Sequence, residues 1–72
     1  MAKDVTVWCL EAPQSNFLKE VRTHGSGQRL VFTDRWDDDC LKFGMKSQAE
    51  RFKKDFGLIW LEVTDHLIMN NE

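Results

Sequence analysis

The feature that most constrains the fold is one short helical signal in a chain that otherwise favours strands. Residues Ser47 to Glu50 match a capping box, in which a serine hydroxyl and a glutamate side chain satisfy the first backbone N–H groups of a helix. An apolar stripe at helical spacing follows, made of Ala49, Phe52 and Phe56. Gly57 stands where a left-handed C-terminal cap belongs. We therefore predict a helix over about residues 48–56.

A helix of under three turns does not persist alone in water, so its two phenylalanines must pack against a sheet. Four segments are rich in β-branched and aromatic residues and predict strands: 5–10, 17–23, 30–33 and 58–63, with 66–69 extending or repairing the last edge. The expected fold class is α+β, a small and mostly antiparallel sheet of three to four strands. One helix packs on one face, in the order β-β-β-α-β.

Turn residues separate these segments. Pro13 lies with serine and asparagine in the first turn, over 11–16, and a glycine-containing loop at 24–27 predicts a tight hairpin. The segment 17–23 alternates imperfectly, and its apolar spacing also suits a short helix capped by Ser15. The strand is favoured because the tight loop and another β-rich run follow it.

The 72 residues are too few for two domains, and 42% apolar residues are too many for a disordered chain, so 1–72 is read as a single domain. A chain of this size buries about 60% of its unfolded surface, which argues against a deep substrate cavity. No apolar run has the length of a signal peptide or a membrane span. We expect a cytoplasmic protein that does not bind membranes.

Two cysteines, Cys9 and Cys40, lie between apolar neighbours in a chain expected in a reducing compartment. Cysteine packs there as a small hydrophobe. We predict two buried free thiols, with a disulfide as the less favoured alternative.

In the last predicted strand, Ile59, Leu61 and Val63 share one face, and Trp60 lies on the other. Trp8 and Trp60 are candidates for a sheet face that the helix leaves open. If the first and last strands are neighbours, the two indoles lie close together as a partner surface, since tryptophan is enriched at interface hot spots. The alternative is a minor core that the loop 34–46 seals, with Trp36 packed into it. Both interpretations stay open.

The most unusual segment is acidic, with four carboxylates around one arginine and one tryptophan. The candidate partner-binding residues here are Asp34, Trp36, Asp37, Asp38 and Asp39. Such a segment can imitate phosphates or complement a basic protein surface. Alternatively, Asp37 or Asp38 caps one helical turn running through Cys40 to Phe43. A metal loop is the least favoured interpretation, because the ligand spacing of known calcium loops is absent.

The net charge is −2, so the whole chain offers no electrostatic argument for nucleic acid. Charge is nevertheless segregated: residues 34–39 carry −3, residues 42–54 carry +4, and residues 55–72 carry −4. The alternative nucleic-acid-binding residues are Lys42, Lys46, Arg51, Lys53 and Lys54. Such segments are more often solvated helix faces than phosphate contacts.

Catalytic patterns are not found in the sequence. The histidines and cysteines are scattered singly rather than at zinc spacing, and nothing selects a nucleophile with an oriented base. The 25–27 glycine pair precedes a predicted strand rather than a helix, so it is no phosphate loop. We expect no enzyme activity, no catalytic or metal site and no cofactor.

Over about residues 30–63 the layout resembles small proteins common in bacteriophage genomes. A hairpin precedes an aromatic-acidic turn, and a Ser-x-x-Glu cap then opens a short helix and a last strand. Cys40 stands where alanine is more usual. The resemblance implies a phage accessory protein that binds and inhibits or redirects a host or defence protein in the host cytoplasm. We predict a monomer or homodimer, because an uncovered strand edge or indole face can be covered by a second copy.

Overall fold

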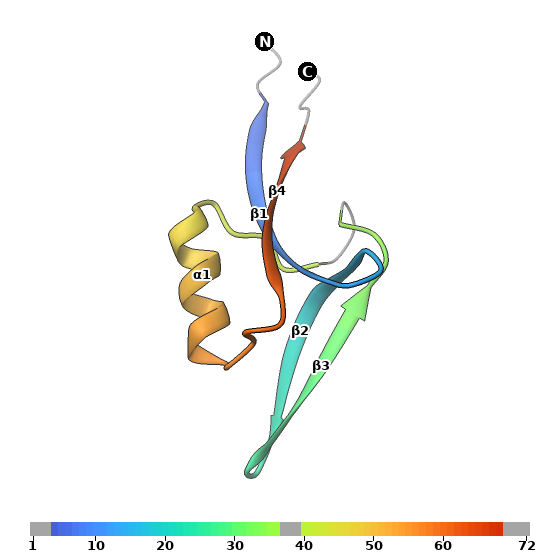
Figure 1. The fold of residues 1–72 in the computed structure, drawn as a ribbon, viewed down its shortest axis with the longest axis vertical. Helices are drawn as coiled ribbons and strands as arrows, with labels where there is room; N and C mark the ends of the chain where they lie inside the picture. The colour runs from blue at the N-terminus through green and yellow to red at the C-terminus, as the bar shows by residue number, and fades with distance from the viewer. Residues whose placement is uncertain (1–3, 37–39, 69–72) are drawn as a thin grey trace.

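The computed structural model describes residues 4–36 and 40–68 of the chain. It contains β1 (Val5–Ala12), β2 (Asn16–His24), β3 (Gly27–Thr33), α1 (Lys46–Asp55) and β4 (Glu62–Ile68) (Figure 1). The strands form one antiparallel sheet in the order β3-β2-β1-β4, with the helix on one face. The α+β fold class and its β-β-β-α-β order are thus confirmed. So is the strand interpretation of 17–23.

Both turns form where the sequence predicts them, each between antiparallel strands. At the β1–β2 turn, Gln14 and Ser15 have positive φ angles of 69° and 60°, and the Asn16 side chain donates to the Pro13 carbonyl. At the β2–β3 turn, His24 pairs with Gly27, and the first turn residue, Gly25, has a φ of 56°. A glycine with positive φ at that position suits a two-residue hairpin.

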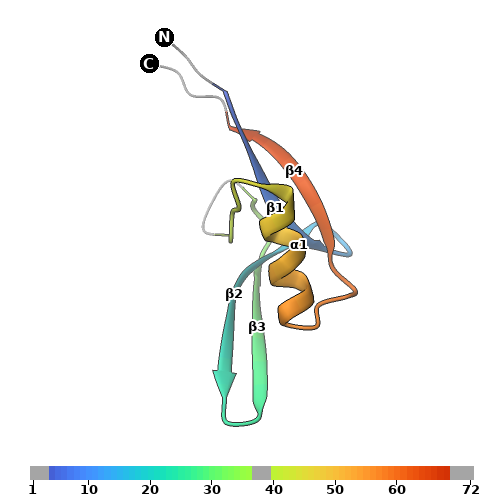
Figure 2. The ribbon, with the colours of Figure 1, turned by 90° about the vertical axis from the view of Figure 1, so that its left-hand side faces the viewer.

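The sheet is divided into two arms that extend in opposite directions (Figures 1 and 2). One arm is the β2–β3 hairpin, and the other is the β1–β4 ladder, which runs from Val5 opposite Ile68 to Glu11 opposite Glu62. The described pairing between β1 and β2 is limited to the last residues beside their turn. The molecule is therefore elongated, measuring 47 × 23 × 21 Å.

The segment after β3 fills the space between the arms. The Leu41 N–H donates to the Leu18 carbonyl of β2 at 3.0 Å. Trp8 of β1 and Phe43 exchange two backbone hydrogen bonds of 2.8 Å on the edge of β1 that faces away from β4. Residues 41–43 thus bond to both arms, which gives β1 a hydrogen-bonding neighbour where β2 has already diverged.

The helix begins earlier than the capping-box pattern predicts. Met45 is the N-cap, its backbone is extended, and its side chain makes no capping hydrogen bond. Ser47 lies inside the first turn, and Glu50 instead approaches Lys46, with 3.9 Å between Oε1 and Nζ. The capping-box prediction is wrong because residues of helical propensity continue back to Lys46, and the Met45 carbonyl accepts the first backbone bonds.

The helix ends as predicted. Gly57 has a φ of 66°, its N–H donates to the Lys54 carbonyl, and the next N–H, of Leu58, donates to the Lys53 carbonyl. This pair of bonds is the Schellman motif. It reverses the chain and aims Leu58 into the core.

The last strand begins later than predicted, at Glu62 rather than Leu58. The Schellman motif places Leu58 in a turn that closes when the Leu61 N–H donates to the Leu58 carbonyl at 3.1 Å. Leu58 and Leu61 are buried, whereas Ile59 and Trp60 between them are exposed. The predicted strand face of Ile59, Leu61 and Val63 is therefore wrong, because residues 58–61 do not alternate as a strand does.

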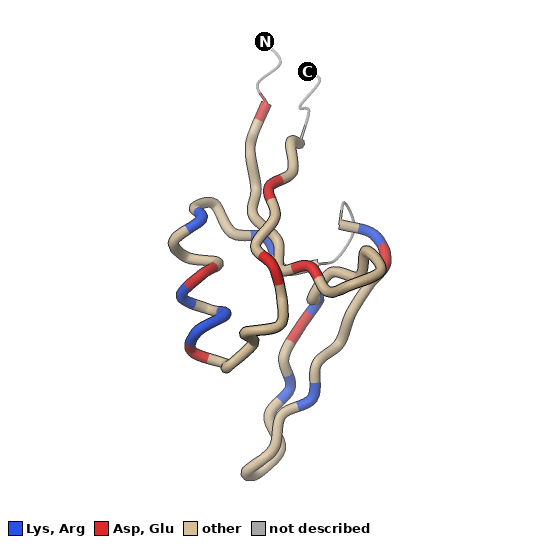
Figure 3. The backbone as a smooth tube through the Cα atoms, viewed as in Figure 1, with Lys and Arg blue, Asp and Glu red and all other residues tan. Residues whose placement is uncertain are grey.

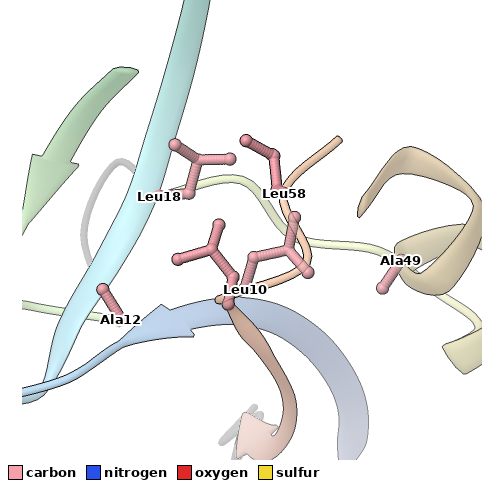
Figure 4. Close-up of a cluster of buried hydrophobic side chains, with 6 residues drawn as sticks. Leu10, Ala12, Leu18, Ala49 and Leu58 are labelled. Carbon is pink, nitrogen blue, oxygen red and sulfur yellow. The ribbon is translucent and has the colours of Figure 1, made fainter. Parts of the chain in front are cut away.

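The helix-side core lies between α1, β1, β2 and the turn that precedes β4 (Figure 4). Its fully or almost fully buried members are Leu10, Ala12, Leu18, Ala49, Leu58 and Leu61. The predicted helical phenylalanines pack at its margin, with the ring centroids of Phe52 and Phe56 4.6 Å apart. Each fully buried leucine contributes roughly 1.5–3 kcal/mol of transfer free energy, so this core holds the helix on the sheet.

Candidate functional site

The opposite face of β1 is covered by a second cluster, which we call the thiol–aromatic cluster: Cys9, Phe17, Cys40, Trp36 and His66. Trp36 stacks on His66 with centroids 4.6 Å apart and planes inclined by 19°. Phe17 meets the same imidazole edge-on at 5.3 Å. This confirms the interpretation in which the loop after β3 seals a minor core with Trp36. The Trp36 ring is half-buried by that packing and is a poor candidate for a partner contact.

The two cysteines meet inside this cluster. Their Sγ atoms are 3.7 Å apart and not bonded, and the Cys40 thiol donates to the Trp36 carbonyl at 2.9 Å. Both are buried free thiols, as predicted. Burial, reinforced by the neighbouring Cys40, raises the pKa of the Cys9 thiol from 9.0 to about 12. Cys9 therefore stays protonated at neutral pH and is a weak nucleophile.

Trp8 and Trp60 do not form the predicted pair. The first and last strands are neighbours, but Trp8 lies on the helix side, where the Lys46 ammonium is 5.9 Å above its ring. Trp60 belongs to the turn before β4 and leans on Phe32 of β3, with centroids 5.8 Å apart. Trp8 and Trp60 thus do not form a paired indole surface on the face opposite the helix. Of the three tryptophans, Trp60 is the most accessible, at 51% exposed.

The acidic segment is described only in part. Asp34 is exposed, while Asp37, Asp38 and Asp39 lie outside the described residues. The predicted helical turn through Phe43 is wrong, because Phe43 bonds to Trp8 as a β-bridge. The role of this segment in partner binding stays a prediction.

The five basic candidates are divided by the fold. The Lys42 ammonium donates to the Cys40 carbonyl at 3.3 Å, and Arg51 approaches Asp55 on the helix at 3.9 Å. Lys46, Lys53 and Lys54 line one groove. Figure 3 shows the basic positions of α1 on the side of the molecule away from β3, with the acidic positions of β4 nearer its centre. The sequence segment therefore does not form a single basic face.

That groove, which we call the α1–β4 groove, has a volume of about 590 Å³. It is lined by Lys46, Glu50, Lys53, Lys54, Ile59, Glu62 and Val63. A smaller hollow of about 300 Å³ lies between Trp60 and the β1–β2 turn, and Glu62 lines both. The turn before β4 thus presents two exposed apolar side chains, Ile59 and Trp60, between two hollows.

Sequence reasoning missed Ile59, which is 85% exposed. The sequence pattern predicts that it shares one strand face with Leu61 and Val63, because the three residues occupy every second position. The signal that points to its exposure is Gly57, because a Schellman cap buries the residue after the glycine and turns the chain before a strand can start.

Within the described ranges, no three His, Cys, Asp or Glu side chains gather closely enough to hold a metal ion. The helix found in those ranges is too short and too polar to cross a membrane. Comparison of the chain with family models, curated proteins and solved structures finds no match. The candidate site therefore rests on the geometry of the chain itself.

Proposed function

We propose that this protein is a non-catalytic interaction module that binds another protein through the turn before β4. The observation that supports this proposal is the exposure of Ile59 and Trp60, side by side in the sequence and flanked by two hollows. Apolar side chains gathered at a surface mark interaction sites more often than isolated ones do. Tryptophan at the centre of such a surface is a frequent hot spot.

The fold does not require these two side chains to be apolar. In the turn 58–61, the leucines at both ends fill the helix-side core, and Ile59 makes no comparable contribution because it faces solvent. Trp60 is held in place against Phe32, which limits the rotamer entropy that it loses on binding. A pre-positioned indole beside an exposed isoleucine is better suited to binding a partner protein than to filling the core of this protein.

The partner follows from the resemblance to phage accessory proteins, which implies a host or defence protein. In this interaction, that protein contacts the Ile59–Trp60 turn. Trp8 and Trp36 are not part of the contact. The acidic segment from Asp34 to Asp39 would add charge complementarity and steer association.

The test is capture from nuclease-treated bacterial lysate by the immobilised protein, followed by mass spectrometry. The double variant Ile59→Ser/Trp60→Ser is expected to lose a captured protein while its circular dichroism spectrum stays native. Met45→Ser is the matched control, because Met45 is 58% exposed but lies at the other end of α1. It should capture as the unaltered protein does.

Two results would overturn the proposal. Capture of the same protein by the double variant and the unaltered chain would show that the turn is not the contact. Capture that disappears when the lysate is nuclease-treated would favour nucleic acid, and loss of that capture on changing Lys53 and Lys54 would assign it to α1.

A further inference from the structure

The outer edge of β4 has backbone groups directed away from the sheet. Both backbone polar groups of Trp8 are bonded to Phe43, on the edge of β1 that faces away from β4. Trp8 opposite Asp65 is therefore a non-hydrogen-bonded pair of the β1–β4 ladder. The N–H and C=O of Asp65 consequently point outward. The two-residue period of the ladder gives Val63 and Leu67 the same orientation.

No described strand pairs with this edge, since β4 is the last strand in the sheet order. The backbone N–H and C=O groups of every second residue, at positions 63, 65 and 67, face outward. Together they form a template for one more strand. Four residues of strand rise by about 3.3 Å each, so the template is about 13 Å long. That length accommodates a segment of about five extended residues.

The α1–β4 groove meets this edge at the start of β4. One flank of the helix contributes Lys46, Glu50, Lys53 and Lys54, and the start of β4 contributes Glu62 and Val63. Ile59 adds exposed apolar surface at the end of the groove where the strand begins. A strand added to the start of β4 would lie next to that helix flank. Exposed sheet edges bind extended peptides in this way, by adding a strand.

The charges that line the groove favour an acidic occupant. Lys46 is partly compensated by Glu50, with 3.9 Å between their charged atoms. Lys53 and Lys54 form no ion pair with a carboxylate of the described chain, and Glu62 is the remaining acid of the lining. Two ammonium groups beside a free strand edge complement carboxylates on an incoming segment.

We propose that an extended, acidic segment of the partner protein adds to β4 as a fifth strand. Its backbone bonds to Val63, Asp65 and Leu67, and its carboxylates approach Lys53 and Lys54. This inference rests on the proposed function and gives it a binding mode and a partner chemistry. Backbone bonds supply affinity in such complexes, and the alternate side chains supply specificity.

The probe is a capped seven-residue peptide in which threonine and glutamate alternate, added to the ¹⁵N-labelled protein. The expected result is slower amide hydrogen exchange at Val63, Asp65 and Leu67. Thr64 and His66 are internal controls, because their N–H groups point toward β1 and are already bonded. A matching peptide with lysine in place of glutamate should bind more weakly, and a peptide N-methylated on alternate residues should give no protection.

Charge variants test the electrostatic half of the proposal. Lys53→Glu and Lys54→Glu, made singly, are each expected to weaken binding of the glutamate peptide about fivefold at low salt. Arg51→Glu is the matched control, since it makes the same charge change on the same helix but does not line the groove. Equal weakening by all three variants would overturn the assignment of the lysines.

The outcomes separate this inference from the proposed function. Absence of protection at the three amides, while Ile59→Ser/Trp60→Ser still abolishes capture, overturns strand addition and leaves the interaction function standing. Protection that rises with protein concentration in the absence of peptide assigns the edge to a second copy and overturns the acidic partner segment. Equal capture by Ile59→Ser/Trp60→Ser and by the unaltered chain overturns the proposed function itself, whether or not the peptide protects the three amides.

Discussion

The two faces of β1 are covered in different ways. On the helix side, aliphatic residues from several elements meet Leu10, and Ala49 brings α1 close to the sheet. On the other side, Cys40 and Trp36, from the segment between β3 and α1, pack with Cys9, and the cover is made of sulfur and aromatic rings. Regular structure seals one face of the strand and a loop seals the other.

The difference shows why a small chain with an apolar composition can leave Ile59 and Trp60 exposed. Both sheet faces near β1 are already covered, so neither side chain is needed to complete a core. The surface turn of residues 58–61 is fixed by its two buried leucines, which hold the exposed pair in place. A turn whose two ends are buried loses less conformational entropy on binding than an unanchored one does.

The largest loss of stability is expected from a cavity in the helix-side core. Leu10→Ala is expected to lower the free energy of unfolding by about 3 kcal/mol, through lost transfer energy and the cavity left behind. Because a domain of this size has only a few kcal/mol of net stability, this variant should be close to its unfolding midpoint at room temperature. Urea titration followed by circular dichroism measures the change.

Leu67→Ala is the control for that experiment. Leu67 is half-exposed on the same ladder, so its loss should cost no more than about 0.5 kcal/mol. Comparable losses at the two leucines would contradict the position of the helix-side core.

The two faces also differ in how well the sequence predicts them. The apolar stripe of α1 and the glycine cap depend on local spacing, and both are found as predicted, with Ala49 buried and Gly57 left-handed. The thiol–aromatic cluster joins Cys9 to Cys40 and Trp36 to His66, pairs that are 30 or more positions apart. Periodicity carries no information on such contacts, so the role of Trp36 remained open at the level of sequence.

The candidate site was the least predictable part. The spacing of Ile59, Leu61 and Val63 indicates a strand. The chain turns there instead, because Leu58 and Leu61 are both buried in the same core and the Leu61 N–H donates to the Leu58 carbonyl. The sequence identifies the lysines of the groove as part of a basic segment. Only the geometry of the helix shows that Lys53 and Lys54 line the groove, whereas Arg51 lies outside it and approaches Asp55. Spacing along the chain does not reveal which flank of a helix meets a strand edge.

Opening the loop-sealed face should have a smaller effect. Trp36→Ala is expected to cost about 1.5 kcal/mol, below the range for a fully buried tryptophan because the ring is only half-buried. The His66 ring protons should shift downfield in the NMR spectrum, since the stacked indole that shields them is removed. A loss as large as that of Leu10→Ala would show that the two faces contribute equally.

The turn that holds Ile59 and Trp60 can be tested through its glycine. Gly57→Ala is expected to cost about 1 kcal/mol, because an L side chain is strained at a φ of 66° even though its Cβ would meet no atom within 4 Å. Gly44→Ala is the matched control, with the same free space and no positive φ, and should be neutral or slightly stabilising. Thermal unfolding of the two variants compares them directly.

The smallest effect at neutral pH concerns the proton on Cys9. The folded protein keeps this proton up to a pH of about 12, whereas the unfolded chain releases it near 9.0. The contribution to stability is therefore complete below pH 9 and is lost as the pH rises from 9 toward 12. Cys9→Ala lacks this dependence, so the stability gap between it and the unaltered protein should narrow above pH 9 and stay constant below it. Urea titrations at pH 7, 9 and 10.5 measure that gap, and a gap that narrows already between pH 7 and 9 would contradict a protonated, buried thiol.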